Sequence, residues 1–440
     1  MIAEIGSPYY SKLSYLLYTK GIIMRYFIFF ISILLLLGCG PGDHMDDDSM
    51  DENTMDSTTT LVTTTSTILY YGDITNDDVV ALDTTYMQLK ERISSNGEYP
   101  YEVAQALGEE LYVINRADYT IGILDSSTNT INNEVALSFY PRSIHINNSD
   151  ILLTSANEPA AAVITSSIAS DSYTDSSYVE PISYGGENAT GHPVWVDDNY
   201  FLLLDRTENT IELYHKESYT PISKLTTQSS VHHVMYKNGY YYGISEGEQN
   251  AVSPGIVKFS VANGKITLAI ERLLSSLSGL PDDFNSTSWG AHHGAFHPTA
   301  DYIYIGSAEG NVFVLDLVNL NLADTFKSGK GIGHFTFYNT MLITTNHYDT
   351  FKSFYDATDP TSHKFIKELN FSDQIYSGIT MQSHTSHIVE NKLYFMFNTD
   401  QDSTLYKIDL EKIIIENSLT LENSYCLMGS FVESTTTSSM

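Results

Sequence analysis

The sequence repeats at intervals of about 40 residues, and this repeat restricts the fold more than any other feature of the chain. Each unit has a polar first strand, a strongly apolar second strand, and a third and fourth strand joined by an Asn/Gly-type turn. The starts of the units lie at or near His192, His297, His387, Tyr112, Pro141, Val231 and Gly333. Four short strands per unit are typical of propeller blades, as in WD40/YVTN-like repeats. We therefore predict an all-β fold, a seven-bladed β-propeller whose count could differ by one.

Composition divides the chain into four segments. Residues 1–39 hold a signal region, and residues 40–65 are acidic and Thr-rich, with little to bury. We expect this second segment to be a flexible linker. The propeller is predicted over residues 66–433, with 66–100 or 426–433 closing the ring, and residues 434–440 are predicted to be a disordered tail.

A short apolar stretch precedes the first cysteine. Arg25 is followed by an apolar run over residues 26–37 and then by Gly38 and Cys39. A basic residue, an apolar core and a small residue before the cut are typical of a secretory signal. The ending Leu-Leu-Gly-Cys resembles the lipobox of bacterial lipoproteins, which implies a lipidated Cys39. We expect translation to start at Met24, and a lipid-anchored protein of the cell envelope that faces the periplasm or the cell surface.

The residue after the lipobox cysteine is Gly40 and not aspartate, which favours the outer membrane. Charge restricts the partners: 54 Asp and Glu against 22 Lys and Arg give a net charge of −32. Such a surface repels nucleic acid and suits cations. The chain has two cysteines. If Cys39 carries lipid, Cys426 has no partner for a disulfide, and thiolate-rich metal sites are excluded. Any metal ion must be held by His, Asp or Glu.

Histidines recur at the starts of the predicted blades. Five units align on the residue before each apolar second strand: Asn199, Asn238, Ala300, Asn339 and Asn391. Five histidines lie an odd number of residues, five or seven, before these positions: His192, His233, His293, His334 and His384. Because side chains alternate along a strand, all five are expected to leave the same face, toward the central channel. Zinc needs three or four such ligands. The sequence therefore predicts an axial zinc site, with copper a weaker candidate.

Of these five histidines, His192, His293 and His384 agree best in height along the axis. Further candidate ligands are His232, His292, His387, His44 and Asp46. The last two belong to the acidic segment before the propeller, where a single imidazole among aspartates could capture a cation loosely. The alternative is that these residues are solvated spacers and that the histidines in the blades are structural.

The order of these motifs resembles that of a known family. His192 before Pro-Val-Trp-Val-Asp-Asp, the pair His232-His233 before an apolar strand, His293-Gly294, His334-Phe335 and the region of His384 are similar to the periplasmic zinc metallochaperones of the AztD type. The segment Gly-Asp-His-Met-Asp-Asp-Asp (42–48) is similar in character to the family's N-terminus. The resemblance implies a monomeric β-propeller that hands zinc to the solute-binding protein of an ABC importer.

Two other functions compete with a metal carrier. A propeller can be an interaction module that binds a protein or a glycan, with structural histidines, because one fold hosts many functions. A hydrolase is the weaker alternative, because the sequence has no G-x-S-x-G, Walker or HExxH motif. We therefore expect a non-catalytic protein.

Overall fold

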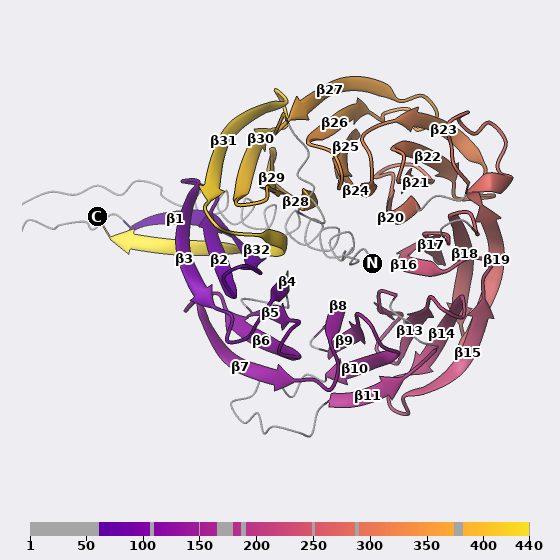
Figure 1. The fold of residues 1–440 in the computed structure, drawn as a ribbon, viewed down its shortest axis with the longest axis horizontal. Helices are drawn as coiled ribbons and strands as arrows, with labels where there is room; N and C mark the ends of the chain where they lie inside the picture. Colours follow the sequence, from indigo (N-terminus) through magenta and orange to yellow (C-terminus); the bar gives the residue numbers. More distant parts are fainter. Residues whose placement is uncertain are drawn as a thin grey trace, which may run out of the picture. The chain divides into compact units, whose positions relative to one another are not determined.

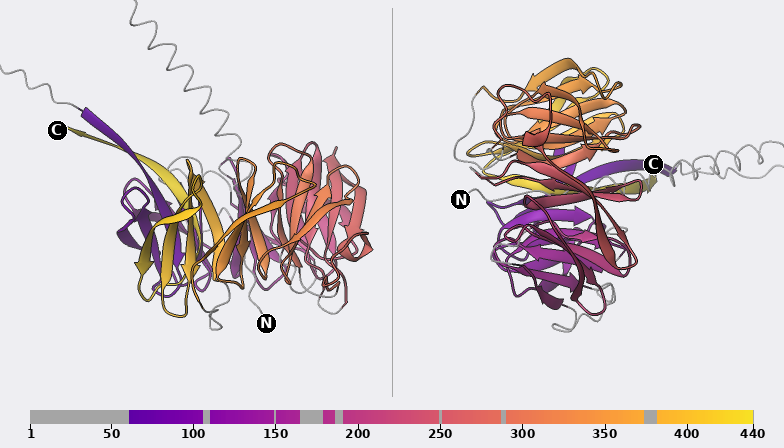
Figure 2. Two further views of the ribbon diagram at one scale, coloured as in Figure 1. Left: turned by 90° about the horizontal axis from the view of Figure 1, so that it is seen from above. Right: turned by 90° about the vertical axis from the view of Figure 1, so that its right-hand side faces the viewer.

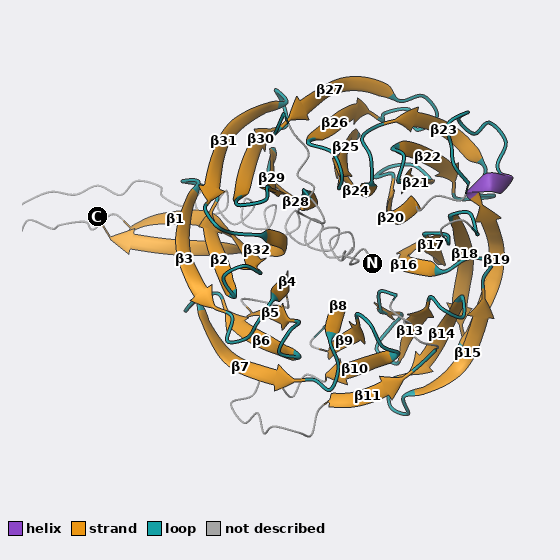
Figure 3. Ribbon diagram, viewed as in Figure 1, coloured by secondary structure: helices purple, strands orange, loops and turns teal. Residues whose placement is uncertain are grey.

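The computed structural model describes residues 61–105, 110–148, 150–164, 179–185, 191–248, 251–286, 290–373 and 382–439. Within them the regular structure is β-strand, apart from one short 3-10 helix, η2 (Leu274–Ser276) (Figure 3). The signal region, Cys39, His44, Asp46 and most of the predicted linker lie outside these residues. No helix in the described part of the chain has the length and apolar character that a membrane span requires.

The strands form successive four-stranded antiparallel sheets arranged around a central axis (Figure 1). The first blades contain β1 (Leu61–Asp73), β2 (Asp78–Asp83), β3 (Gln88–Ser94), β4 (Pro100–Gln105), β5 (Glu110–Asn115), β6 (Thr120–Asp125), β7 (Thr130–Ala136), β8 (Pro141–Asn147), β9 (Asp150–Ser155), β10 (Ala160–Ile164) and β11 (Val179–Ser183). The next contain β12 (Val194–Trp195), β13 (Tyr200–Asp205), β14 (Thr210–His215), β15 (Thr220–Thr226), β16 (Val231–Lys237), β17 (Tyr240–Ser245), β18 (Gly255–Ala262) and β19 (Lys265–Leu273).

The remaining blades contain β20 (Gly290–Phe296), β21 (Tyr302–Ser307), β22 (Asn311–Asp316), β23 (Leu322–Lys327), β24 (Ile332–Tyr338), β25 (Met341–Asn346), β26 (Phe351–Asp356), β27 (Lys364–Asn370), β28 (Ser383–Val389), β29 (Lys392–Asn398), β30 (Ser403–Asp409), β31 (Ile414–Leu421) and β32 (Cys426–Ser439). In the blades that begin with β4, β8, β12, β16, β20, β24 and β28 the first strand lies nearest the axis and the last lies at the rim (Figure 1). This order places the polar first strands, with their histidines, around the channel.

The last strand closes the ring by joining the first blade. β32 pairs beside β1, so that this sheet runs β3-β2-β1-β32, and the two strands lie side by side in Figure 2. A single parallel bridge, Met428 to Glu102, links β32 to β4 of the next blade. Residues 66–100 and residues 426–433, which we predicted as alternatives for closing the ring, therefore both take part. Residues 66–434 lie in one compact unit, and the ends of β1 and β32 (61–65 and 435–439) are grouped in a second.

The propeller prediction is confirmed, with eight four-stranded units among the described residues, one above the predicted seven and within the stated range. The extra blade is the one that combines both ends of the chain, which no single stretch of sequence displays. β1 begins at Leu61, before the predicted boundary at 66, and β32 extends to Ser439 through most of the predicted tail.

Apolar second and third strands build the core. β9 and β13 are buried over all but their first residue, whereas the rim strand β15 has only exposed and half-buried positions. Side chains of neighbouring blades pack together, as in the cluster of Met235, Ile244, Ile256, Ile305 and Phe313. Packing between blades therefore fixes the inner strands, and with them the histidines, relative to one another.

Candidate metal centre

Eight histidines form one cluster at the axis. They come from five consecutive blades and are joined by ring-to-ring distances of 4.4–6.3 Å: His192, His232, His233, His292, His293, His334, His347 and His384. Most lie on the inner strands β16, β20, β24 and β28. His192 precedes β12, where its backbone N–H donates to the carbonyl oxygen of His232 at 3.0 Å.

Each of the four inner strands has a bulge at its histidines. In β16, Val231 pairs with Ser245 and His233 with Ile244, so one residue is inserted at His232. In β20, Gly290 pairs with Ser307 and Gly294 with Ile305, so His292 and His293 lie in the irregular stretch. A bulge interrupts the alternation of side chains. For this reason both members of each histidine pair reach the cluster. Strict alternation along the strand, which selected His233 and His293, is therefore an incomplete guide.

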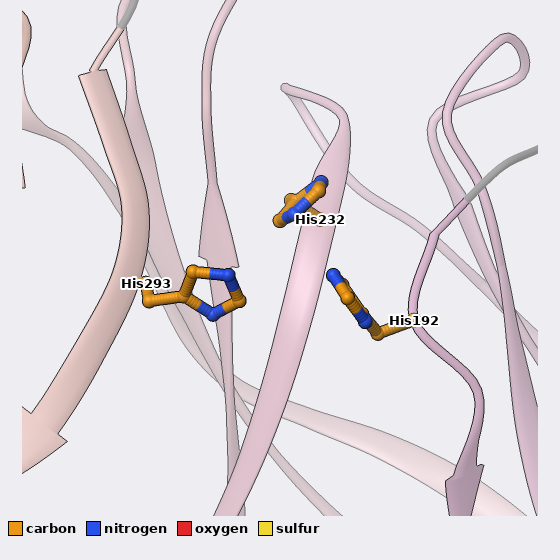
Figure 4. A group of neighbouring side chains, drawn as sticks. All are labelled: His192, His232 and His293. Atoms are coloured by element: carbon orange, nitrogen blue, oxygen red, sulfur yellow. The ribbon is translucent and has the colours of Figure 1, made fainter. Parts of the chain in front are cut away.

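His192, His232 and His293 form the most deeply buried group of candidate ligands. Each offers a ring nitrogen within 4.8 Å of the others, and the rings face a common space between their strands (Figure 4). Their exposed fractions are 1%, 0% and 1%. Neither ring nitrogen of any of the three has a hydrogen-bond partner. Buried polar atoms are normally paired, so six unsatisfied nitrogens in one place point to a bound ligand.

Burial keeps these imidazoles neutral. It is the main cause that holds the pKa of His192, His232 and His293 well below the usual value, and charge on neighbouring histidines would lower it further. The pKa of His233 is lowered to about 3, again chiefly by burial. Neutral imidazole is the form that binds metal ions. The cluster is therefore ready to accept a cation without first losing protons.

His334, His347 and His384 form a second histidine group. Their candidate ligand atoms also lie within 4.8 Å of one another, and Nε2 of His334 lies 3.4 Å from Nε2 of His384. Burial again lowers the pKa of His334 and His347 well below the usual value. The rings of His293 and His334 stack at 4.4 Å and join the two groups.

His347 was missed by the sequence analysis. It follows β25 and not an inner strand, so the alignment of blade starts passes over it. A Cβ atom at Gly333 would lie 1.9 Å from the His347 ring. The absence of a side chain at Gly333 therefore leaves the space that His347 occupies. In the sequence alone, a glycine before a histidine does not indicate that another histidine lies against it.

A third group combines two histidines with a carboxylate. Glu246, His232 and His292 also place candidate ligand atoms within 4.8 Å of one another. Glu246 is 2% exposed, and Arg206 forms an ion pair with it. Burial favours the neutral acid, but Arg206, His292 and Arg142 outweigh it and lower the pKa of Glu246 to about 2. The group therefore contains an oxygen donor that is ionised at neutral pH.

The structure brings all five predicted ligands into the cluster. His192 and His293 fall in the first group and His334 and His384 in the second, while His233 lies beside His293 at 4.7 Å between ring centroids. Two of the further candidates, His232 and His292, are also in the cluster. His387 is not in any of the groups and packs instead against Tyr71 and Phe431.

The other described histidines serve the fold. His297 accepts from the backbone N–H of Ala300 at 3.0 Å, and its Nε2 lies 2.8 Å from the carbonyl oxygen of Ala357. His145 accepts from the backbone N–H of Trp195, and His215 from that of Glu217. Their ring nitrogens have protein partners, unlike those of His192, His232 and His293.

The donor set fits a tetrahedral metal ion. Zinc binds imidazole nitrogen at ~2.0–2.1 Å, which places the ligand nitrogens of a tetrahedron ~3.4 Å apart. The nitrogens of the first group lie within 4.8 Å, so small side-chain rotations would bring them to that spacing. Three histidine ligands leave a fourth position open. Histidine without thiolate suits Zn²⁺ better than Cu⁺.

No known protein family matches the sequence, and no curated protein does. Solved structures share the fold. Apo AztD from Citrobacter koseri superimposes with a TM-score of 0.54 and 12% identity over 84% of this chain and 99% of the other. The dihydro-heme d1 dehydrogenase NirN gives 0.61 at 12% identity over 83% and 74%, and the C-terminal WD40 domain of Sif2 gives 0.56 at 13% over 77% and 92%. At these identities the likeness shows the fold alone.

Proposed function

We propose that this chain is a non-catalytic carrier of divalent transition-metal ions, with zinc as its cargo. The observation that carries the proposal is the group of six buried ring nitrogens without hydrogen bonds on His192, His232 and His293. Leaving such groups unpaired costs ~1–3 kcal/mol each. A bound cation would repay this cost, whereas a purely structural role leaves it uncompensated.

The second histidine group extends the capacity of the site. His334, His347 and His384 lie beside the first group, so the channel could hold a second ion a few ångströms away. The net charge of −32 attracts cations to the protein and repels other polyanions. Both features suit a protein that collects metal ions and passes them on.

We further propose that Cys39 carries lipid and restricts this activity to one membrane surface, the outer membrane being favoured. The recipient in this proposal is the solute-binding protein of a zinc importer, as the resemblance to the AztD type implies. Labelling with a fatty acid in cells would mark the wild-type protein but not Cys39→Ser. Equal labelling of the two proteins would disprove the anchor and leave the metal site unaffected.

Elemental analysis of the mature protein, purified without added metal, tests the function. We expect at least one equivalent of zinc, and a loss of affinity of at least ~100-fold in His192→Ala, since even outer partners of metal ligands contribute 10–100-fold. His215→Ala is the matched control, because His215 lies outside the cluster. A wild-type protein without stoichiometric zinc, and unchanged by chelators, would overturn the proposal and favour an interaction module.

A further inference from the structure

Glu246 is the one carboxylate residue in the described candidate metal groups, and each of its oxygens has a defined partner. It follows β17 and lies among three partners. Its Oε1 contacts Nδ1 of His292, and its Oε2 lies 2.5 Å from Nη2 of Arg206 and 3.6 Å from Nδ1 of His232. A buried carboxylate needs paired charge, and here two of the three partners are also candidate metal ligands.

His232 belongs to two groups at once. It is a candidate ligand with His192 and His293, and also with Glu246 and His292. Its ring lies 4.7 Å from that of His192 and stacks on that of His292 at 4.4 Å. An ion held by His232 could therefore exchange its other ligands, one group for the other, without leaving this residue.

The two groups differ in their access to solvent. The side chain of His292 is 16% exposed, whereas those of His192, His232 and His293 are at most 1% exposed. The inner group therefore has almost no contact with water. Of the residues in the two groups, His292 is the most exposed, and Glu246 beside it is 2% exposed.

From this arrangement we infer that Glu246, His232 and His292 form a transfer site for a divalent metal ion, through which zinc enters and leaves the His192–His232–His293 site. Arg206 limits the affinity of this site, because its guanidinium forms an ion pair with the carboxylate that the metal ion would bind. Zinc keeps His232 as a ligand while Glu246 and His292 replace His192 and His293, so at no step is the ion without protein donors. The inference rests on the proposed function.

Stopped-flow release of zinc from the loaded mature protein to a chromogenic chelator tests the transfer site. In Glu246→Gln we expect zinc release to slow by about tenfold, because the ion loses the carboxylate donor through which it leaves, an effect within the 10–100-fold range found for groups that tune a metal site. In Arg206→Gln we expect the opposite, faster release, because the carboxylate no longer has a competing cation. Glu248→Gln, an exposed carboxylate two residues away, is the matched control and should release zinc like the wild type.

The opposite signs separate a transfer site from a structural ion pair. A structural pair predicts that Glu246→Gln and Arg206→Gln change release in the same direction, and that result would overturn the inference. If Glu246→Gln does not fold, His292→Asn replaces it, and an unchanged release rate in that variant would equally overturn it. Absence of zinc binding in the wild type refutes the proposed function, whereas wild-type binding with unchanged rates in the variants refutes the transfer site alone.

Discussion

Histidine has two roles in the described residues, and His363 and His192 illustrate them. His363 shows the structural role: its Nδ1 lies 2.7 Å from Asp324 Oδ2 and its Nε2 lies 2.8 Å from the hydroxyl of Tyr304. His192 shows the other role, with two buried nitrogens and no hydrogen bond. The same side chain is thus a cross-link between strands in one place and a candidate ligand in another.

The structural role can be tested at His363. His363→Ala should lower the free energy of unfolding by about 2–4 kcal/mol, since it removes two hydrogen bonds, one to a charged group, and opens a cavity. The zinc content should stay as in the wild type. Chemical denaturation and elemental analysis measure the two quantities. Loss of zinc at unchanged stability would contradict the assignment.

The titration of His387 gives a pH dependence. Burial lowers its pKa to about 4, whereas an unfolded chain has a histidine pKa of ~6.5. Between these pH values His387 is protonated in the unfolded chain but neutral in the folded protein. The contribution of His387 to the free energy of unfolding therefore falls by ~1.4 kcal/mol per pH unit as pH decreases. The stability is fully present above pH ~6.5.

The variant His387→Gln should therefore flatten the dependence of stability on pH between ~6.5 and about 4 by close to one proton. Denaturation of the metal-depleted protein at several pH values measures this slope. The apo protein is required because bound metal would add its own proton linkage. Equal slopes in the two proteins would show that His387 titrates normally in the native state.

At the scale of strands, irregularity positions the site. The bulges in β16 and β20 turn both histidines of each pair into the cluster. A further residue arrives from the end of a second strand, where Gly333 accommodates His347.

Gly333→Ala tests the position of His347. The new methyl group would lie 1.9 Å from its ring, so His347 must leave the second group. We expect the variant to lose binding at His334–His347–His384 while the first group keeps its ion. Titration with Co²⁺, followed by its absorption bands, would count the occupied sites. Gly122→Ala is the control, because its methyl group would meet Ile131 at 3.3 Å and the carbonyl oxygen of Ser95 at 3.4 Å, with no atom closer.

At the scale of the whole molecule, closure of the ring sets the geometry of the site. All the clustered histidines come from the five consecutive blades that begin with β12, β16, β20, β24 and β28. Their separation depends on the angle between blades, which the closed ring fixes. β32 supplies the closure: Cys426 accepts from Asn398 through its carbonyl oxygen, and Ser430 donates to the carbonyl oxygen of Val103, each at 2.8 Å.

Deleting residues 426–440 should therefore abolish cooperative unfolding and weaken metal binding, although no histidine is removed. The deletion exposes the edge of β1 and opens the ring, and open sheet edges promote aggregation. Thermal melting by circular dichroism and gel filtration would show both effects. Deletion of 435–440 alone is the control, since the propeller unit ends at Ser434. A cooperative melt in the longer deletion would contradict this account of closure.

The sequence alone determined the all-β propeller, because the repeat of strand lengths and apolar second strands is visible in the order of the residues. It also located the five blades that carry axial histidines, since each histidine lies near a strand start. Only the tertiary structure decided the eighth blade, brought the candidates His232 and His292 into the cluster, and added His347 and Glu246. Closure joins residues more than 300 positions apart, and a bulge reverses the direction of a side chain without leaving a sequence signal. Ligand groups of this kind depend on distances between strands, and packing sets those distances.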